Sequence, residues 1–150
     1  MIPLPRVLIL ALTFCFGLPL VQISDTLQAQ AVHADSTLAA AHRLFAEANL
    51  LANRGHHDQA EPKLLRVLSM REKALGLDHP DVALTLHNLG FIYNAQDRYA
   101  EAEPLLRRAL AIRETVLGPQ HLEVALTLNS LAFTYGVQSR YDEAEPLYER

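Results

Sequence analysis

Tryptophan is absent from this sequence of 150 residues, and cysteine occurs once, as Cys15. Runs of lysine and arginine are missing too, and the formal net charge is -4 at pH 7. A chain without a basic patch does not attract a phosphate backbone, so we do not expect nucleic acid as a partner. Hydrophobic residues make up 50% and charged residues 20%, which excludes the composition of a disordered chain.

The N-terminal segment has a composition of its own. Arg6 precedes an uncharged apolar stretch at residues 7–21, which is shorter than the roughly 20 residues that span a membrane as a helix. The small-x-small sequence Ala-Gln-Ala follows at residues 29–31, as at a signal cleavage site. We therefore predict a signal peptide at residues 1–31, with cleavage after residue 34 as an alternative, and an exported protein, periplasmic or secreted. The other interpretation is a membrane anchor formed by residues 7–21.

Cys15 lies inside this apolar stretch. Bulky Phe14 precedes it, and the apolar segment before it is short, so the site does not resemble a lipoprotein signal. If cleavage occurs near Ala31, the mature protein contains no thiol. It then has no disulfide, no thiolate metal site and no cysteine nucleophile.

The rest of the chain repeats itself every 42 residues. The tripeptide Ala-Glu-Pro begins at Ala60, Ala102 and Ala144, and residues 81–106 match residues 123–148 at 16 of 26 positions. Similarity at a fixed long period indicates tandem structural units. Within residues 35–150 we place the units at 39–80, 81–122 and 123–150, the last one incomplete.

Each unit is predicted to contain two helices, which in the second unit cover about 81–96 and 100–117. The first helix has one buried face at helical spacing, made of Leu86, Leu89, Gly90 and Tyr93. The second helix has an apolar stripe, made of Ala102, Leu105, Ala109, Ile112 and Val116. At Gly90 a small side chain lets two helices approach closely.

The helix ends have matching signals. Gly76 and Gly118 are expected to end the second helices. Polar side chains are expected to start the helices that follow: Asp78, Asp81, Gln120 and Glu123. In the first unit we expect a cap within residues 35–37, and Glu47 in place of the buried Leu89 suits a terminal repeat whose outer face meets water.

This pattern resembles the tetratricopeptide repeat. The residues at the signature spacings of that family are Gly90, Tyr93, Tyr99, Ala102 and Ala109, with Leu86 where the family often has tryptophan. The usual period is 34 residues, and the longer unit here resembles the kinesin light chain type. The resemblance implies an all-α fold: a right-handed solenoid of antiparallel helix pairs with about two and a half repeats.

Motifs for catalysis are lacking. The chain has no GxSxG, HExxH, Walker loop or dinucleotide-binding glycine pattern. His79 and His121 recur at the repeat interval, so we interpret them as connection residues that form local hydrogen bonds. His56 and His57 are adjacent, and adjacent histidines rarely chelate one ion well. We therefore expect no catalytic residue, no metal and no cofactor.

The resemblance implies instead that the first helices line a concave groove that binds short peptide segments. The outward face of these helices mixes amides, which can pair with a peptide backbone, and rings, which can fill pockets. The candidate groove residues are Asn49, Asn53, His87, Phe91, Asn94, Asn129 and Phe133. For Phe91 and Phe133 the alternative is packing between repeats.

The sequence thus predicts a scaffold for a protein or peptide partner, not an enzyme. Two further hypotheses remain, because the sequence stops at Arg150, inside the second helix of a unit. The chain could be an oligomerisation module that self-associates through its open C-terminal end. It could also be a fragment of a longer repeat protein whose effector or catalytic domain lies beyond residue 150. Membrane contact is expected only if residues 7–21 are retained.

Overall fold

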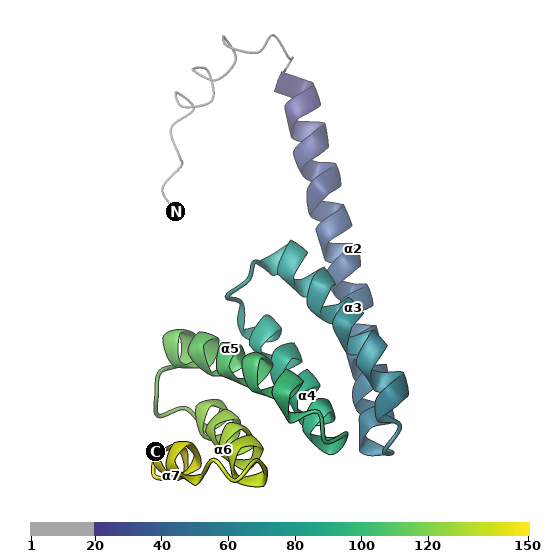
Figure 1. Ribbon diagram of the computed structural model, residues 1–150. Coiled ribbons are helices and arrows are strands. Elements are labelled where there is room, and N and C mark those ends of the chain that lie inside the picture. Colours follow the sequence, from purple (N-terminus) through teal and green to yellow (C-terminus); the bar gives the residue numbers. More distant parts are fainter. Residues whose placement is uncertain (1–19) are drawn as a thin grey trace. The chain divides into compact units, whose positions relative to one another are not determined.

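The structure is a computed structural model that describes residues 20–150, with side chains from residue 28 onward. The helices of this part are α2 (Leu20–Asn53), α3 (His57–Leu75), α4 (Pro80–Ala95), α5 (Tyr99–Leu117), α6 (Leu122–Val137) and α7 (Tyr141–Tyr148), as Figure 1 shows. Between residues 20 and 150 no helix is both long enough and apolar enough to cross a membrane.

The chain divides into two compact units, Met1–Ser36 and Thr37–Arg150. Most of the predicted signal peptide, and of the apolar stretch at 7–21, lies outside the described residues. The predicted cleavage sequence at residues 29–31 lies within α2. The second unit contains the repeats.

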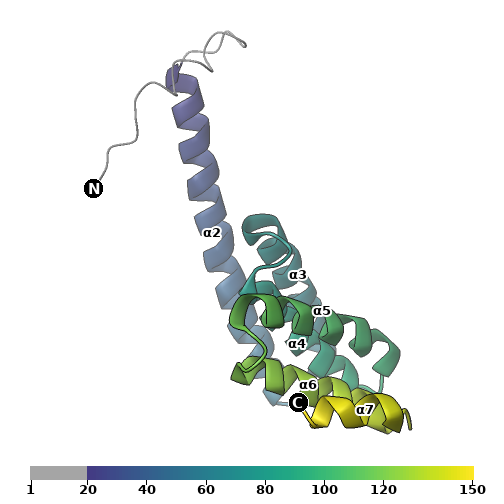
Figure 2. The ribbon, with the colours of Figure 1, turned by 90° about the vertical axis from the view of Figure 1, so that its left-hand side faces the viewer.

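Antiparallel helix pairs build the repeat unit. The C-terminal part of α2 pairs with α3, α4 pairs with α5, and α6 pairs with the short α7, which Figures 1 and 2 show in two views. The helices α4 and α5 begin and end within one residue of the predicted bounds. The predicted all-α solenoid of about two and a half tetratricopeptide-like repeats is confirmed.

The connections between pairs correct one prediction about helix starts. The N-cap residues of α4 and α6 are His79 and His121, not Asp78 and Gln120. The Nδ1 atom of His79 accepts a hydrogen bond from the backbone N–H of Asp81 at 3.1 Å, and His121 does the same for the next helix. The histidines therefore form the local hydrogen bonds that their recurrence predicted.

The helix ends at Gly76 and Gly118 are confirmed. Both are C-cap residues with φ angles of 90° and 84°, a region that side chains strongly disfavour. Their backbone N–H groups donate to Glu72 and Glu114, four residues back. Glycine at this position therefore allows the chain to turn sharply into the connection.

The predicted face of the first helices is buried in both complete copies. In α4, Leu86 and Leu89 are fully buried, and the equivalent residues of α6 are buried as well. A Cβ atom at Gly90 would lie 2.6 Å from Cγ of Leu106. The need for a small residue at this position is therefore confirmed.

The predicted stripe of α5 is confirmed at Ala102, Ala109 and Ile112, which are buried, and differs at its other two positions. Leu106 is fully buried, whereas Leu105 is half-buried and Val116 is 48% exposed. The reason is the close approach at Gly90, because it gives Leu106 space against α4 that only a glycine leaves open.

The start of the first repeat also differs from prediction. Residues 35–37 lie inside α2 and do not cap a helix, because no glycine or proline interrupts residues 20–53. The Ser36 hydroxyl donates to the His33 carbonyl instead. Glu47 is exposed as predicted, and its carboxylate lies 2.8 Å from Nζ of Lys63.

Candidate functional site

Each second helix is joined to the next repeat through a glutamate. Glu61 of α3 accepts a hydrogen bond from the Tyr93 hydroxyl at 3.2 Å and another from Arg98 at 2.6 Å. One period later Glu103 accepts from Tyr135 at 3.1 Å and from Arg140 at 2.6 Å. We call each set a glutamate clasp.

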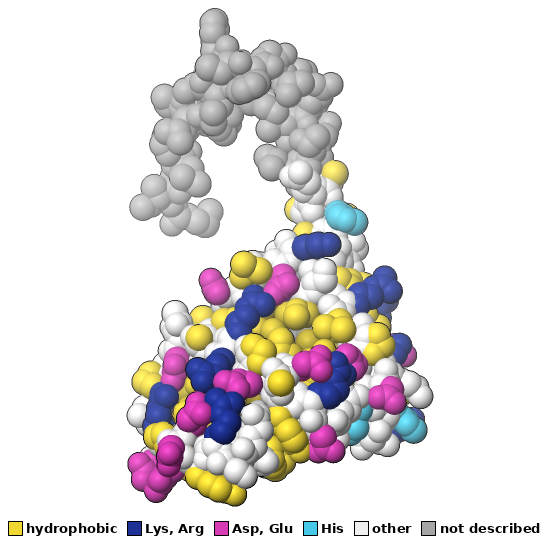
Figure 3. Space-filling view, in the orientation of Figure 1, with side chains coloured by type: hydrophobic (Ala, Val, Ile, Leu, Met, Phe, Trp, Pro, Cys, Tyr) yellow, Lys and Arg dark blue, Asp and Glu magenta, His cyan; other side chains and the backbone are white. Residues whose placement is uncertain are grey.

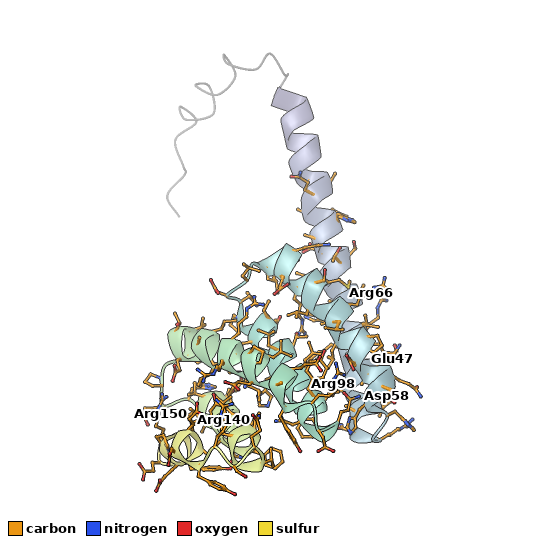
Figure 4. The ribbon with its side chains drawn as sticks, in the orientation of Figure 1. Glu47, Asp58, Arg66, Arg98, Arg140 and Arg150 are labelled. Carbon is orange, nitrogen blue, oxygen red and sulfur yellow. The ribbon has the colours of Figure 1, made fainter. Side chains whose placement is uncertain are left out.

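In the clasp of Glu103, the surroundings shift the pKa values of the glutamate and the tyrosine. Hydrogen bonds from Arg140, supported by Tyr135, hold the pKa of Glu103 below its usual range. Burial raises the pKa of the Tyr135 hydroxyl, and the neighbouring Glu103 raises it further. Figure 4 shows Arg98 and Arg140 reaching toward the neighbouring second helices. At neutral pH the clasp of Glu103 therefore joins a charged pair and a neutral phenol.

A buried arginine makes a second link between repeats. Arg71 is 2% exposed and donates to the Asp81 carbonyl and the Thr85 hydroxyl at 2.9 and 2.8 Å. Arg113 repeats these contacts in the next connection, with Glu123 and Thr127. Because both links recur at the repeat interval, the first helices are held in a regular row.

Two depressions lie on this row of first helices. One, of about 350 Å³, is lined by Phe91, Asn94, Ala95, Asn129, Ser130, Phe133 and Tyr148; we call it the aromatic pocket. The other, of about 280 Å³, is lined by Asn49, Ala52, Asn53, Leu64, Asn88, Phe91 and Ile92; we call it the amide pocket. Phe91 lines both, so the pockets adjoin on one surface, which we call the first-helix face.

The rings and two of the amides predicted for the groove lie open on this face. Phe91 is 55% exposed and Phe133 is 48% exposed, so neither ring is consumed by packing between repeats. Asn53 and Asn129 are exposed as well. Within the described residues, the Asn129 side chain forms no hydrogen bond and is available to a bound molecule.

The other predicted amides have partners inside the protein. Asn94 is 8% exposed, and its side chain exchanges hydrogen bonds with the Thr134 hydroxyl at 2.9 and 3.1 Å. Asn49 is half-buried and accepts a hydrogen bond from Asn88 at 2.8 Å. Asn94 thus joins α4 to α6, while the Asn49–Asn88 pair joins α2 to α4.

His87 lies apart from both pockets. Its side chain is half-buried, and burial together with the nearby positive charge of Arg113 lowers its pKa to about 4. The Nδ1 atom is buried without a hydrogen-bond partner. The structure therefore places His87 beside an internal arginine and does not bring it together with the other predicted groove residues.

Seven lining residues were not predicted from the sequence, of which three carry polar groups: Asn88, Ser130 and Tyr148. Asn88 and Ser130 occupy equivalent positions in α4 and α6, next to the predicted face. A signal was present, because both are small polar residues that recur at the repeat interval. Tyr148 comes from the second helix of its pair, which the prediction assigned wholly to the opposite side.

The linings of both pockets are uncharged. Neither pocket is lined by Asp, Glu, Lys, Arg or His in the described part of the chain. The charged side chains instead crowd the surface that Figure 3 shows, where basic and acidic groups alternate around apolar side chains. Among residues 28–150, no three His, Cys, Asp or Glu side chains converge as a metal site would require.

A family model described as tetratricopeptide repeat matches residues 36–115 and again residues 81–150. No curated protein sequence matches this one closely enough to count as a relative.

Solved structures of kinesin light chain type resemble the chain. The nearly identical TPR-like repeats of a kinesin light chain-type protein from Podosopora anserina share 26% identity at a TM-score of 0.65, over 72% of this chain and 51% of that one. BtubC (BKLC) from P. vanneervenii shares 20% identity at a TM-score of 0.70, over 85% of this chain and 55% of that one. The chain spans about half the length of these structures.

Proposed function

Because the chain belongs to the tetratricopeptide repeat family, we propose that it is a scaffold that holds a peptide segment of a partner protein on its first-helix face. Repeats of this family generally mediate protein–protein interactions, and their fold is typically non-catalytic. The proposal adds to this general role a surface, a kind of partner and a set of residues.

The observation that carries the proposal is the pair of adjoining pockets. They follow one another along the first helices, with Phe91 between them and with exposed rings and amides in their linings. Exposed aromatic rings on a soluble protein have a free-energy cost in water that a bound apolar group removes. A continuous strip of this kind suits an extended chain better than a compact small molecule.

Selection from a random peptide library displayed on phage tests the proposal. We expect the immobilised protein to enrich peptides whose binding is lost with Phe133→Ala or Asn129→Ala. Val116→Ala is the matched control, because Val116 on α5 is also 48% exposed but lies away from both pockets. The proposal fails if no peptide is enriched, or if the control weakens binding as much as the pocket variants do.

Export of this scaffold is part of the proposal. It is supported by the charge and hydropathy pattern of residues 1–31, with Arg6 before an apolar stretch and a small-x-small sequence after it. A scaffold with this leader would meet its partner in the periplasm or outside the cell.

A further inference from the structure

The lack of charged side chains in the linings of both pockets limits the partner that they can bind. An ionised side chain entering either pocket would lose water and gain no opposite charge, which is strongly unfavourable. The arginine and glutamate of each clasp are already paired with each other. Charge complementarity therefore favours an uncharged bound segment.

The aromatic pocket is suited to one large apolar side chain. Three rings line it, from Phe91, Phe133 and Tyr148. Two of its polar side chains are already engaged, since Ser130 donates to the Leu126 carbonyl and Asn94 is paired with Thr134. The pocket thus offers apolar contact, while the exposed amide of Asn129 can hydrogen bond to a peptide backbone.

The amide pocket is suited to a polar peptide backbone. Asn88 donates to the side-chain carbonyl of Asn49 at 2.8 Å, and this bond uses only part of each amide. A primary amide has two N–H donors and one carbonyl acceptor, so the pair retains free N–H groups on Asn49 and a free acceptor on Asn88. A peptide unit presents one carbonyl and one N–H. The carbonyl can accept from the free N–H groups of Asn49, and the N–H can donate to the free carbonyl of Asn88.

The spacing of the first helices sets the distance between the two pockets. One lies between α2 and α4 and the other between α4 and α6, so they are one helix apart. Packed helices are separated by roughly 8–10 Å. An extended chain advances roughly 3.3 Å per residue, so about three residues separate the two contacts.

We propose that the bound segment is an uncharged extended peptide with one large apolar side chain in the aromatic pocket. A backbone amide of this peptide, about three residues from that side chain, pairs with Asn49 and Asn88. This inference rests on the proposed function and adds the chemistry of the partner. It excludes acidic, basic and phosphorylated segments from this face.

Resynthesised peptides test the inference by fluorescence anisotropy with the full chain. The probes are the peptides selected from the library, with both ends blocked to remove terminal charges. We expect replacement of the large apolar residue by alanine to weaken binding about tenfold or more, as for a buried anchor. Asp or Lys beside the anchor is expected to weaken binding by similar factors, because the pocket linings have no charge of either sign.

A scan of single N-methyl groups tests the backbone contact without changing the protein. We expect about a fivefold or greater loss at one position about three residues from the anchor, where methylation removes the donor. Asn88→Ala should remove this sensitivity, because Asn88 carries the free acceptor for the peptide N–H, while the preference for a large apolar anchor should remain. Phe133→Ala should remove the preference for a large apolar anchor and leave the sensitivity to N-methylation.

The two proposals fail in different ways. If the selected peptides are rich in acidic or basic residues and still require Phe133, the chemistry proposed here is wrong and the peptide-binding role stands. A scan with no sensitive position, or one that is equally sensitive in Asn88→Ala, overturns the backbone contact. If no peptide requires Phe133 or Asn129, the proposed function itself is wrong.

Discussion

At the scale of single residues, the predicted groove position of His87 carries a different residue in each repeat. It is occupied by Phe45, His87 and Asn129 in turn. The first packs its ring under the guanidinium of Arg71, 4.4 Å from the ring centroid, and the second lies near Arg113. The sequence predicted His87 as a groove residue from its place on the helix, but periodicity could not reveal an arginine that reaches it from another helix.

This contact predicts a pH-dependent stability. Burial and Arg113 lower the pKa of His87 from 6.5 to about 4. Between pH 6.5 and about pH 4, His87 is therefore protonated in the unfolded chain but neutral in the folded protein. The free energy of unfolding falls as the pH falls through this window. The loss at pH 4.5 should be roughly 2–3 kcal/mol.

Urea unfolding at pH 7 and pH 4.5 measures this loss. The variant His87→Asn, which copies the third repeat, should lose less stability between the two pH values than the native chain. An equal loss in both proteins would mean that His87 is not the responsible group.

The glutamate clasp gives a second prediction for a single residue. Glu103→Gln should lower the free energy of unfolding by about 1 kcal/mol, because an amide replaces the charged acceptor of Tyr135 and Arg140 at a partly exposed site. Glu145→Gln is the matched control, since Glu145 occupies the equivalent position and is exposed. Chemical unfolding of the two variants in parallel would contradict the account if both changes were equal.

At the scale of helices, the sequence predicted most of the bounds and fewer of the contacts. The 42-residue period placed α4 and α5 within one residue, and the repeated glycines Gly76 and Gly118 marked where the second helices end. It did not predict that Leu106 of α5 is buried. That choice depends on the distance between two helices, which the pattern of one helix does not contain.

The contact between α4 and α5 predicts opposite effects for two similar substitutions. Gly90→Ala should destabilise the protein by about 1–3 kcal/mol, because its Cβ would lie 2.6 Å from Cγ of the fully buried Leu106. Gly136→Ala should stabilise by up to about 1 kcal/mol, because no atom lies within 4 Å of the added Cβ and alanine favours the helix.

Thermal unfolding followed by circular dichroism checks both substitutions. The double variant Gly90→Ala with Leu106→Ala should be less destabilised than the sum of the single changes, because the second substitution removes the clash. If Gly90→Ala raised the melting temperature as Gly136→Ala does, the close approach of α4 and α5 would be contradicted.

At the scale of the whole molecule, the candidate site was predicted in part. Four predicted residues line the aromatic pocket, Phe91, Asn94, Asn129 and Phe133. Periodicity identified them because a helix has one outward face. It could not show that Asn94 is bonded to Thr134, or that Tyr148 joins the lining from α7, since both depend on how repeats stack.

The N-terminal segment also makes a prediction for the whole molecule. When the complete sequence is expressed in a host that recognises its leader, the mature protein should begin at Val32, or at Asp35 if the alternative site is used. Mass spectrometry of the intact exported protein measures this start. Ala29→Leu with Ala31→Leu should block cleavage at the first site, because bulky residues do not fit a signal cleavage sequence. An exported protein that retains Met1 would contradict the signal peptide.

Photo-crosslinking tests the central claim most directly, that a peptide binds on the first-helix face. A photoreactive amino acid is placed at Asn129, beside the aromatic pocket, or at Val116, on the second helix of the preceding pair. Each protein is irradiated with a library-selected peptide, and the products are mapped by mass spectrometry. The account predicts peptide adducts from position 129 and none from position 116, and adducts from position 116 alone would contradict it.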